Sequence, residues 1–161
     1  MAPSENRALH YGEPGPPSEH FRGPITRTSA GPNLPRMPDA SNRPSAHAVQ
    51  RAAHFCLENK ARDVVILDLA GVSDMTDYFV IASGTSDTHV RSTGEHVLEA
   101  MRKDGTRAHH VEGLSQGRWV LLDFVDFVVH IFHPSLREFY QLERLWGDAA
   151  VVSVDQSGAL R

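Results

Sequence analysis

The chain has 161 residues, a formal net charge of −4 at pH 7, 40% hydrophobic residues and 22% charged residues, which are ordinary values for one globular domain with a tail. No apolar run approaches the roughly 20 residues of a membrane span. The negative charge argues against direct binding to nucleic acid, which depends on clustered Lys and Arg. If the protein acts near RNA, we expect it to do so by contacting another protein.

The single cysteine, Cys56, cannot form an internal disulfide and has no CxxC partner that would hold zinc. The first 20 residues lack the charged and then apolar pattern of a secretory signal. These features favour a reducing compartment, and we expect a cytoplasmic protein.

Residues 1–44 contain all but one of the ten prolines and few large aliphatic side chains. Such a segment cannot bury enough apolar surface to offset the entropy of ordering it. We therefore expect a disordered tail over 1–44, a folded domain over 45–147 and a flexible tail over 148–161.

The folded part should open with an amphipathic helix that has Ser45 as its N-cap. Apolar residues recur there at the spacing of one helical face, namely Val49, Ala52, Ala53, Cys56 and Leu57. Cys56 then lies in the core stripe, where a free thiol acts as a small hydrophobe.

Two short runs rich in Val and Ile, 63–69 and 77–83, predict buried strands. The segment after Gly84 has apolar residues on one side and predicts a helix that stops at Gly105, a good C′ residue. Gly94 lies in the middle of this helix and costs about 1 kcal/mol relative to Ala. We therefore expect another element to approach closely at Gly94.

The remaining elements are three strands and a helix. The strands are expected over 108–112, 119–124 and 127–132, the last two forming a hairpin. The helix should run from Ser135 to Trp146 and begin with a capping box between Ser135 and Glu138. The sequence thus predicts a single α/β domain in the order α-β-β-α-β-β-β-α, with helices packed on a mixed five-stranded sheet.

The hairpin and the segment after it carry two carboxylates and two histidines, which are typical of active sites. Asp123 and Asp126 are three residues apart, so a continuous strand would direct them to opposite faces, and a hairpin turn would leave Asp126 in the loop. His130 and His133 also diverge along a strand, and no third ligand has metal spacing. We expect roles in turns and strand ends, and no metal site.

The segment Gly84–Ser86 joins a predicted strand to a predicted helix and resembles the Gly-Ser loop of nucleotidyltransferases. Its backbone N–H groups could bind an anion at the helix N-terminus. Those enzymes also need an Asp-x-Asp pair about a dozen residues later to hold magnesium, and 91–104 contains no such pair. We therefore favour a structural turn at Gly84 in which Thr85 or Ser86 caps the helix.

Five motifs in order resemble the ribosomal silencing factor family, also called RsfS or Iojap, over roughly 45–147. They are "TDYFVIASGTS" (76–86), "VEG" (111–113), "WVLLDF" (119–124), "VVHIF" (128–132) and "REFYQLERLW" (137–146). The resemblance implies a fold related to nucleotidyltransferases without their catalytic acids, and no cofactor. It also implies binding to the large ribosomal subunit through ribosomal protein L14, which blocks joining of the small subunit and lowers translation. Organellar relatives act in large-subunit assembly.

Two features depart from the family pattern. Family members usually have Gly-Asp in the hairpin turn, where this chain has Val125 and Asp126. Because a β-branched residue tolerates a positive φ poorly, we expect a different turn type or a longer loop. The proline-rich extension also lies outside the family core.

Our hypothesis from the sequence is a non-enzymatic translational repressor that docks on a ribosomal protein. Large aromatic and aliphatic side chains commonly anchor interfaces, and acidic groups would complement a basic partner. The anchor candidates are Trp119, Tyr140, Leu142 and Trp146; the acidic candidates are Asp77, Asp123, Glu138 and Glu143. We also expect that a homodimer could form off the ribosome.

Two alternatives remain open. One is a large-subunit assembly factor that uses the same docked face. The other is a Mg-dependent nucleotidyltransferase that uses the Gly84–Ser86 loop, with Asp123 and Asp126 as metal ligands.

Overall fold

The computed structural model describes residue 43 and residues 45–154. Apart from Arg43, the predicted tail over 1–44 lies outside the described residues, as does 155–161. The elements are α2 (Ala46–Glu58), β1 (Arg62–Asp68), β2 (Tyr78–Ser83), α3 (Asp87–Lys103), β3 (His110–Glu112), β4 (Trp119–Asp123), β5 (Phe127–Phe132), α4 (Pro134–Tyr140), α5 (Leu142–Leu145) and β6 (Ala150–Ser153). None of these described helices is long and apolar enough to cross a membrane.

The strands form one mixed sheet in the order β3-β4-β5-β2-β1-β6. At its centre β2 and β5 run parallel, with Tyr78 opposite Phe127 and Ser83 opposite Phe132, while all the other neighbouring strands are antiparallel. Every residue of β2 and β5 is buried, which explains their continuous apolar sequences, because both faces of these strands are covered. The predicted α/β fold with a mixed sheet is confirmed.

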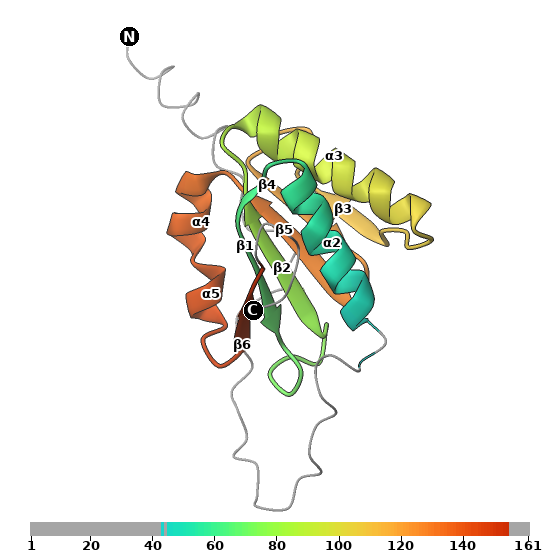
Figure 1. Cartoon of the computed structure of the whole chain (residues 1–161). Helices are drawn as coiled ribbons and strands as arrows, with labels where there is room; N and C mark the ends of the chain where they lie inside the picture. The colour runs from blue at the N-terminus through green and yellow to red at the C-terminus, as the bar shows by residue number, and fades with distance from the viewer. Residues whose placement is uncertain (1–42, 44, 155–161) are drawn as a thin grey trace, which may run out of the picture.

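The helices cover the two faces of the sheet separately: α2 and α3 lie together on one face, and α4 and α5 lie on the other (Figure 1). Side chains alternate along each strand, so Val80 packs toward α2 and α3 while Phe79 and Ile81 pack toward α4 and α5. The sheet therefore separates two hydrophobic cores.

The predicted first helix is confirmed as α2, and all five residues of its apolar stripe are buried. Burial raises the pKa of the Cys56 thiol to about 12, so the thiol stays protonated and packs as an apolar group. The predicted cap is only partly correct. Ser45 directly precedes the helix, but its backbone is already helical (φ −78°, ψ −16°) and its side chain makes no capping hydrogen bond.

A sixth strand, β6, was not predicted. It pairs antiparallel with β1, with Ala150 opposite Asp68 and Ser153 opposite Val65, so the sheet extends past the expected domain boundary at residue 147. A turn in which the amide of Ala149 donates to the carbonyl of Trp146 (2.9 Å) leads into it. The run "AAVVSV" (149–154) has the Val-rich composition of a strand, but it lies within the tail expected over 148–161, so its pairing with the edge of β1 was not anticipated.

The expected helix from Ser135 to Trp146 is two helices. It begins one residue earlier than predicted, because Pro134 holds the preceding His133 in an extended conformation (φ −62°, ψ 141°), where the imidazole accepts a hydrogen bond from the amide of Ser135. His133 therefore replaces Ser135 as the cap, and the predicted capping box does not form.

The helix breaks at Gln141, whose φ is +48°. In one continuous helix Leu136 and Leu142 would lie about 120° apart around the axis. The break allows both leucines to enter the same core, which is the packing reason for two short helices.

Gly94 is confirmed as a point of close approach. A Cβ atom built on Gly94 would lie 2.9 Å from Leu114 Cδ2 and 2.9 Å from Val120 Cγ1, closer than carbon atoms pack in protein interiors. The absence of a side chain at this position therefore lets α3 lie directly against β4.

We expect Gly94→Ala to lower the free energy of unfolding by about 1–3 kcal/mol, because the added methyl group overpacks the contact with Leu114 and Val120. In an open helix the same change would stabilise the protein by about 1 kcal/mol. Urea denaturation of the two proteins measures the difference, and a stabilised variant would contradict the close packing.

Candidate docking surface

The nucleotidyltransferase alternative requires the Gly84–Ser86 loop to lie near Asp123 and Asp126. In the structure the loop and these carboxylates lie at opposite ends of the sheet. Gly84 follows the end of β2, whereas Asp126 precedes the start of the parallel strand β5. Asp126 is level with Asp77 in this register, so seven residue steps along the strand separate it from Gly84 by roughly 23 Å. The structure therefore does not bring the Gly84–Ser86 loop together with Asp123 and Asp126.

The backbone of the Gly84–Ser86 loop is bonded within the protein. The amide of Gly84 donates to the carbonyl of Phe132 (2.9 Å), and the amide of Thr85 donates to His89 Nδ1 (2.9 Å). Ser86 Oγ accepts from the amide of His89 (3.1 Å) and caps α3. This confirms the structural turn predicted at Gly84 with Ser86 as the cap.

His130 is a buried structural residue. The indole Nε1–H of Trp119 donates to His130 Nδ1 (3.1 Å), and the ring of Phe79 meets the imidazole edge to face, with centroids 4.6 Å apart. Burial lowers the pKa of His130 to about 3. The imidazole is therefore neutral near pH 7 and carries its proton on Nε2, because Nδ1 is an acceptor.

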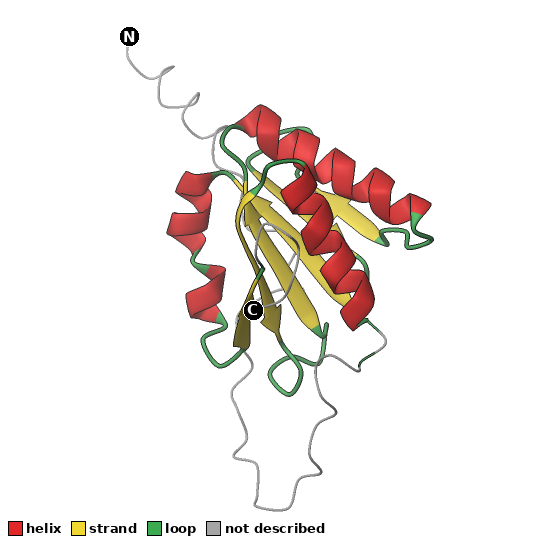
Figure 2. Cartoon of the chain, in the orientation of Figure 1, coloured by secondary structure: helices red, strands yellow, loops and turns green. Residues whose placement is uncertain are grey.

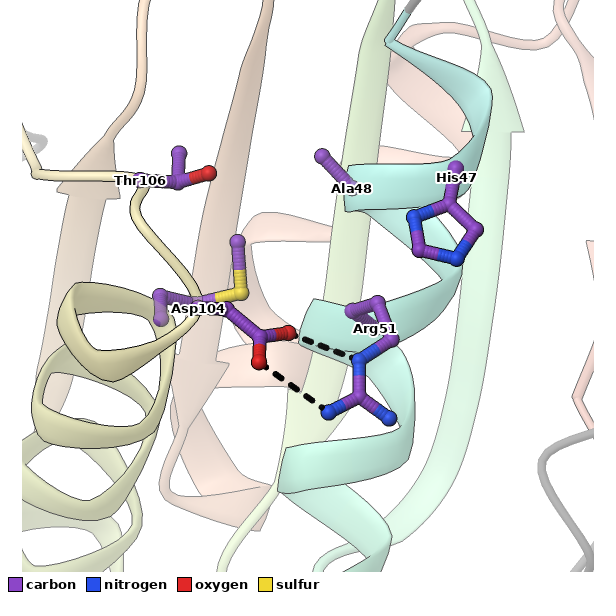
Figure 3. Close-up of a pocket in the computed structure, with 6 residues that line it drawn as sticks. His47, Ala48, Arg51, Asp104 and Thr106 are labelled. Carbon is purple, nitrogen blue, oxygen red and sulfur yellow. Dashed lines mark hydrogen bonds and ion pairs between the residues drawn. The ribbon is translucent and has the colours of Figure 1, made fainter.

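A shallow hollow of about 380 Å³ lies between the start of α2 and the segment after α3 (Figure 3). At its rim Arg51 donates to the carboxylate of Asp104 through Nε (2.7 Å) and Nη2 (3.3 Å). The two charged side chains that line the hollow thus bind each other. Among the residues that the structure describes, no group of three or more His, Cys, Asp or Glu side chains is arranged to hold a metal.

Three of the expected anchor residues lie inside the protein. Trp119, Leu142 and Trp146 are buried in the core beneath α4 and α5. Their large apolar side chains cover that face of the sheet, so they are not part of an exposed docking surface. Tyr140 is partly buried, and its ring lies 4.6 Å from that of Trp119.

The two acidic candidates on α4 and α5 differ. Glu143 Oε1 accepts from Arg137 Nε (2.9 Å) and Nη2 (2.7 Å), while Arg137 Nη1 donates to Ser83 Oγ (2.8 Å). Glu143 is therefore neutralised locally and helps hold α4 to the end of β2. Glu138 is exposed, and the neighbouring Phe139 is 75% exposed.

Asp77 and Asp123, the other two acidic candidates, lie in loops that meet at one end of the sheet. The amide of Asp77 donates to the carbonyl of Asp126 (2.8 Å), which joins the loop after β1 (Figure 2) to the turn between β4 and β5. We call residues 74–77 and 123–126 together the acidic end. Its carboxylates are Asp74, Asp77, Asp123 and Asp126, and it contains no Lys or Arg.

The turn at Val125 is of a different type from the usual two-residue hairpin turn, as expected, but Val125 does not avoid a positive φ. Val125 has φ +74°, and the amide of Asp126 donates to the carbonyl of Phe124 (3.0 Å), which makes a three-residue γ-turn. Asp123 Oδ1 holds the turn by accepting from the amide of Val125 (2.8 Å). The β-branched residue is therefore forced into a positive φ that we expected it to avoid.

The acidic end also exposes two apolar side chains. Met75 is 54% exposed and Val125 is 57% exposed. Apolar groups among carboxylates that form no ion pair with a described residue are what a basic protein surface with apolar contacts would complement. Neither Met75 nor the pairing of the two loops was predicted from the sequence, although both segments lack basic residues.

The comparisons with known proteins agree with one another. A family model described as "Ribosomal silencing factor during starvation" matches residues 42–160. The ribosomal silencing factor RsfS of Bacillus subtilis is 39% identical over 104 residues, which cover 65% of this chain and 88% of that protein. A solved structure from Chromobacterium violaceum has a TM-score of 0.60 and 30% identity, and covers 63% of this chain and 85% of its own.

One organellar relative extends further along the chain. The mouse protein named "Mitochondrial assembly of ribosomal large subunit protein 1" is 29% identical over 149 residues, which cover 91% of this chain and 61% of the mouse protein.

The low pKa of His130 predicts a defined pH dependence. The unfolded imidazole binds a proton below about pH 6.5 whereas the folded one stays neutral down to about pH 3, so acid favours unfolding across this window. His130→Asn keeps an acceptor for Trp119 but cannot titrate. We expect wild type to lose stability relative to the variant by up to roughly 1.4 kcal/mol per pH unit below pH 6.5. If the unfolding free energies of wild type and of the His130→Asn variant changed with pH in parallel, His130 would not be a neutral buried residue.

Because Val125 has a positive φ, we expect its replacement by glycine to stabilise the protein. Val125→Gly should raise the free energy of unfolding by about 1 kcal/mol, because glycine adopts a positive φ without strain. Val151→Gly is the matched control, since Val151 is equally exposed at 56% but lies in β6, where glycine should destabilise. Urea midpoints of the two variants test this, and equal losses of stability would exclude strain at Val125.

Proposed function

Because the chain belongs to the family of ribosomal silencing factors, we propose that it binds the large ribosomal subunit through ribosomal protein L14 and sterically blocks association with the small subunit. The acidic end is the docking surface in this proposal. The observation that carries it is the hydrogen bond between Asp77 and Asp126, which combines two acidic loops and two exposed apolar side chains into one surface.

The chemistry of the acidic end suits a basic ribosomal protein. Carboxylates on the rim of an interface steer a positively charged partner and raise the association rate. Met75 and Val125 would supply apolar contacts within the interface, where Met is an enriched residue type. Asp77 and Asp123 are partly buried, so their charges are less screened by solvent than those of fully exposed side chains.

To block association of the two subunits sterically, the bound protein needs only sufficient size. A folded body of about 110 residues has a radius of gyration of roughly 13 Å. Held at the face where two subunits meet, a body of that size keeps the surfaces apart. We propose that the protein represses translation in the cytoplasm in this way and is not an enzyme, which is supported by the separation between the Gly84 loop and the carboxylates.

A second candidate function is assembly of the large subunit. The name of the mouse relative favours it, and that relative matches most of this chain. Both functions use the same docked face. Loss of an assembly factor leads to accumulation of precursor ribosomal RNA, whereas loss of a silencing factor leaves maturation unchanged and subunit joining unrestrained. The homodimer expected off the ribosome stays a prediction.

We expect the double variant Asp77→Asn, Asp123→Asn to bind large subunits about tenfold more weakly than wild type in cosedimentation. Asn keeps a side-chain acceptor for the amide of Val125, so the turn should persist. The loss should shrink at high salt, because screening weakens the wild-type attraction.

The matched control is Glu95→Gln, Glu99→Gln, which removes two carboxylates from α3, outside the acidic end. We expect this control to bind large subunits like wild type and to block subunit joining equally well. Equal affinity of the Asp77/Asp123 variant and wild type would reject the acidic end as the docking surface.

A further inference from the structure

Three buried polar atoms beside the acidic end have no hydrogen-bond partner among the described residues. They are Arg43 Nε, Arg43 Nη1 and Thr76 Oγ1. Thr76 lies between Met75 and Asp77 and is only 6% exposed. Because buried polar groups are almost always hydrogen-bonded, these atoms indicate that further polar groups belong at this end of the sheet.

Arg43 shows how a basic side chain binds at this end. Its guanidinium forms an ion pair with Asp68, the last residue of β1, and lies 4.4 Å from the centroid of the Tyr78 ring, at the start of β2. Asp77, in the acidic end, directly precedes Tyr78. The chain that precedes the folded domain therefore leads away from a point next to the acidic end.

The sequence before Arg43 has the composition of a ligand for this surface. Residues 20–38, "HFRGPITRTSAGPNLPRMP", contain three arginines and no Asp or Glu. They also contain four large apolar side chains, Phe21, Ile25, Leu34 and Met37. Basic and apolar groups in one segment complement the carboxylates of the acidic end and its exposed Met75 and Val125.

The chain between this segment and Arg43 is long enough for the segment to reach the acidic end. Seven residue steps lead from Arg36 to Arg43 and can span up to roughly 24 Å. The acidic end extends from β1 across β2 and β5 to β4, three strand spacings or roughly 14 Å. Arg36 and Arg27 can therefore reach any of its four carboxylates.

We propose that residues 20–38 of this chain bind to its own acidic end. A segment in this position supplies backbone carbonyls for Arg43 Nε and Nη1, a partner for the Thr76 hydroxyl, and arginines for the carboxylates. If the docking role proposed above for the acidic end holds, the bound segment also competes with the basic partner and acts as a built-in inhibitor, since a tethered ligand has a high effective concentration.

The first arm of the test measures the contact without ribosomes. A spin label is attached to full-length protein carrying Ser29→Cys. Cys56 does not interfere, because burial keeps its thiol pKa near 12. We expect the label to broaden the amide resonances of 74–77 and 123–126. The broadening should disappear when Arg22→Gln, Arg27→Gln and Arg36→Gln are added, because the charge attraction is then removed.

Two outcomes of this arm overturn the proposal. One is the absence of broadening at the acidic end, or broadening that survives the three Gln substitutions. The other is broadening in a mixture of spin-labelled protein and isotope-labelled protein without a spin label, at the same strength as within one chain, which would assign the segment to a second copy.

The second arm measures competition. The variant Arg22→Gln, Arg27→Gln, Arg36→Gln should bind large subunits at least about threefold more tightly than wild type, because a larger fraction of molecules has a free acidic end. The control Arg7→Gln, Lys103→Gln, Arg107→Gln removes the same charge outside the segment and should not tighten binding. Unchanged affinity in the first variant would reject competition.

The two proposals fail in different ways. If the acidic end is not the docking surface, the Asp77/Asp123 variant binds large subunits normally while the spin-label contact persists. If the segment does not bind the acidic end, the contact is absent while the Asp77/Asp123 variant still loses affinity.

Discussion

The parallel pairing of β2 with β5 is the constraint on which the rest of the structure depends. It buries both strands on both faces, so helices must cover the sheet on each side. Its register also determines which loops meet. Because Tyr78 lies opposite Phe127, the residues that precede each strand are neighbours, and Asp77 bonds to Asp126. One backbone register therefore produces both the central core and the acidic end.

The face under α4 and α5 depends on a polar pair inside an apolar core. Trp119 Nε1 donates to His130 Nδ1, and Phe79, Phe132 and Tyr140 pack around the two rings. Such a pair is compatible with a core only while the imidazole is neutral, since a buried unpaired charge is costly. These side chains form the layer on which α4 and α5 rest, and so determine which of their residues reach solvent.

Periodicity in the sequence was enough to predict α2, α3 and the strands β1, β2, β4 and β5, because each has a continuous or regularly spaced apolar pattern. The edge strand β3 is short, contains no buried residue and has no such pattern. The Val-rich run of β6 lies within the expected C-terminal tail, so its pairing with β1 was not predicted. The break at Gln141 follows from packing of Leu136 and Leu142, which the sequence pattern does not show. The burial of Trp119 and Trp146 could not be predicted from the sequence either, because the sequence does not show whether an aromatic side chain at these positions points to the core or to solvent. The two loops of the acidic end lie side by side because of the register between β2 and β5. That register could not be predicted from the sequence.

The position of β6 has a consequence for how the protein opens. This strand forms backbone pairs with β1 alone at the edge of the sheet, Val152 packs against the core on one side, and Val151 on the other side is more than half exposed. Its amides should therefore exchange with deuterium well before those of β2 and β5, in a sub-global opening that leaves the centre intact. Once β6 detaches, β1 presents an unpaired backbone edge, which is the template that strands use to add to a sheet or to aggregate. The short last strand thus works as a protective cover for β1 as well as a part of the sheet.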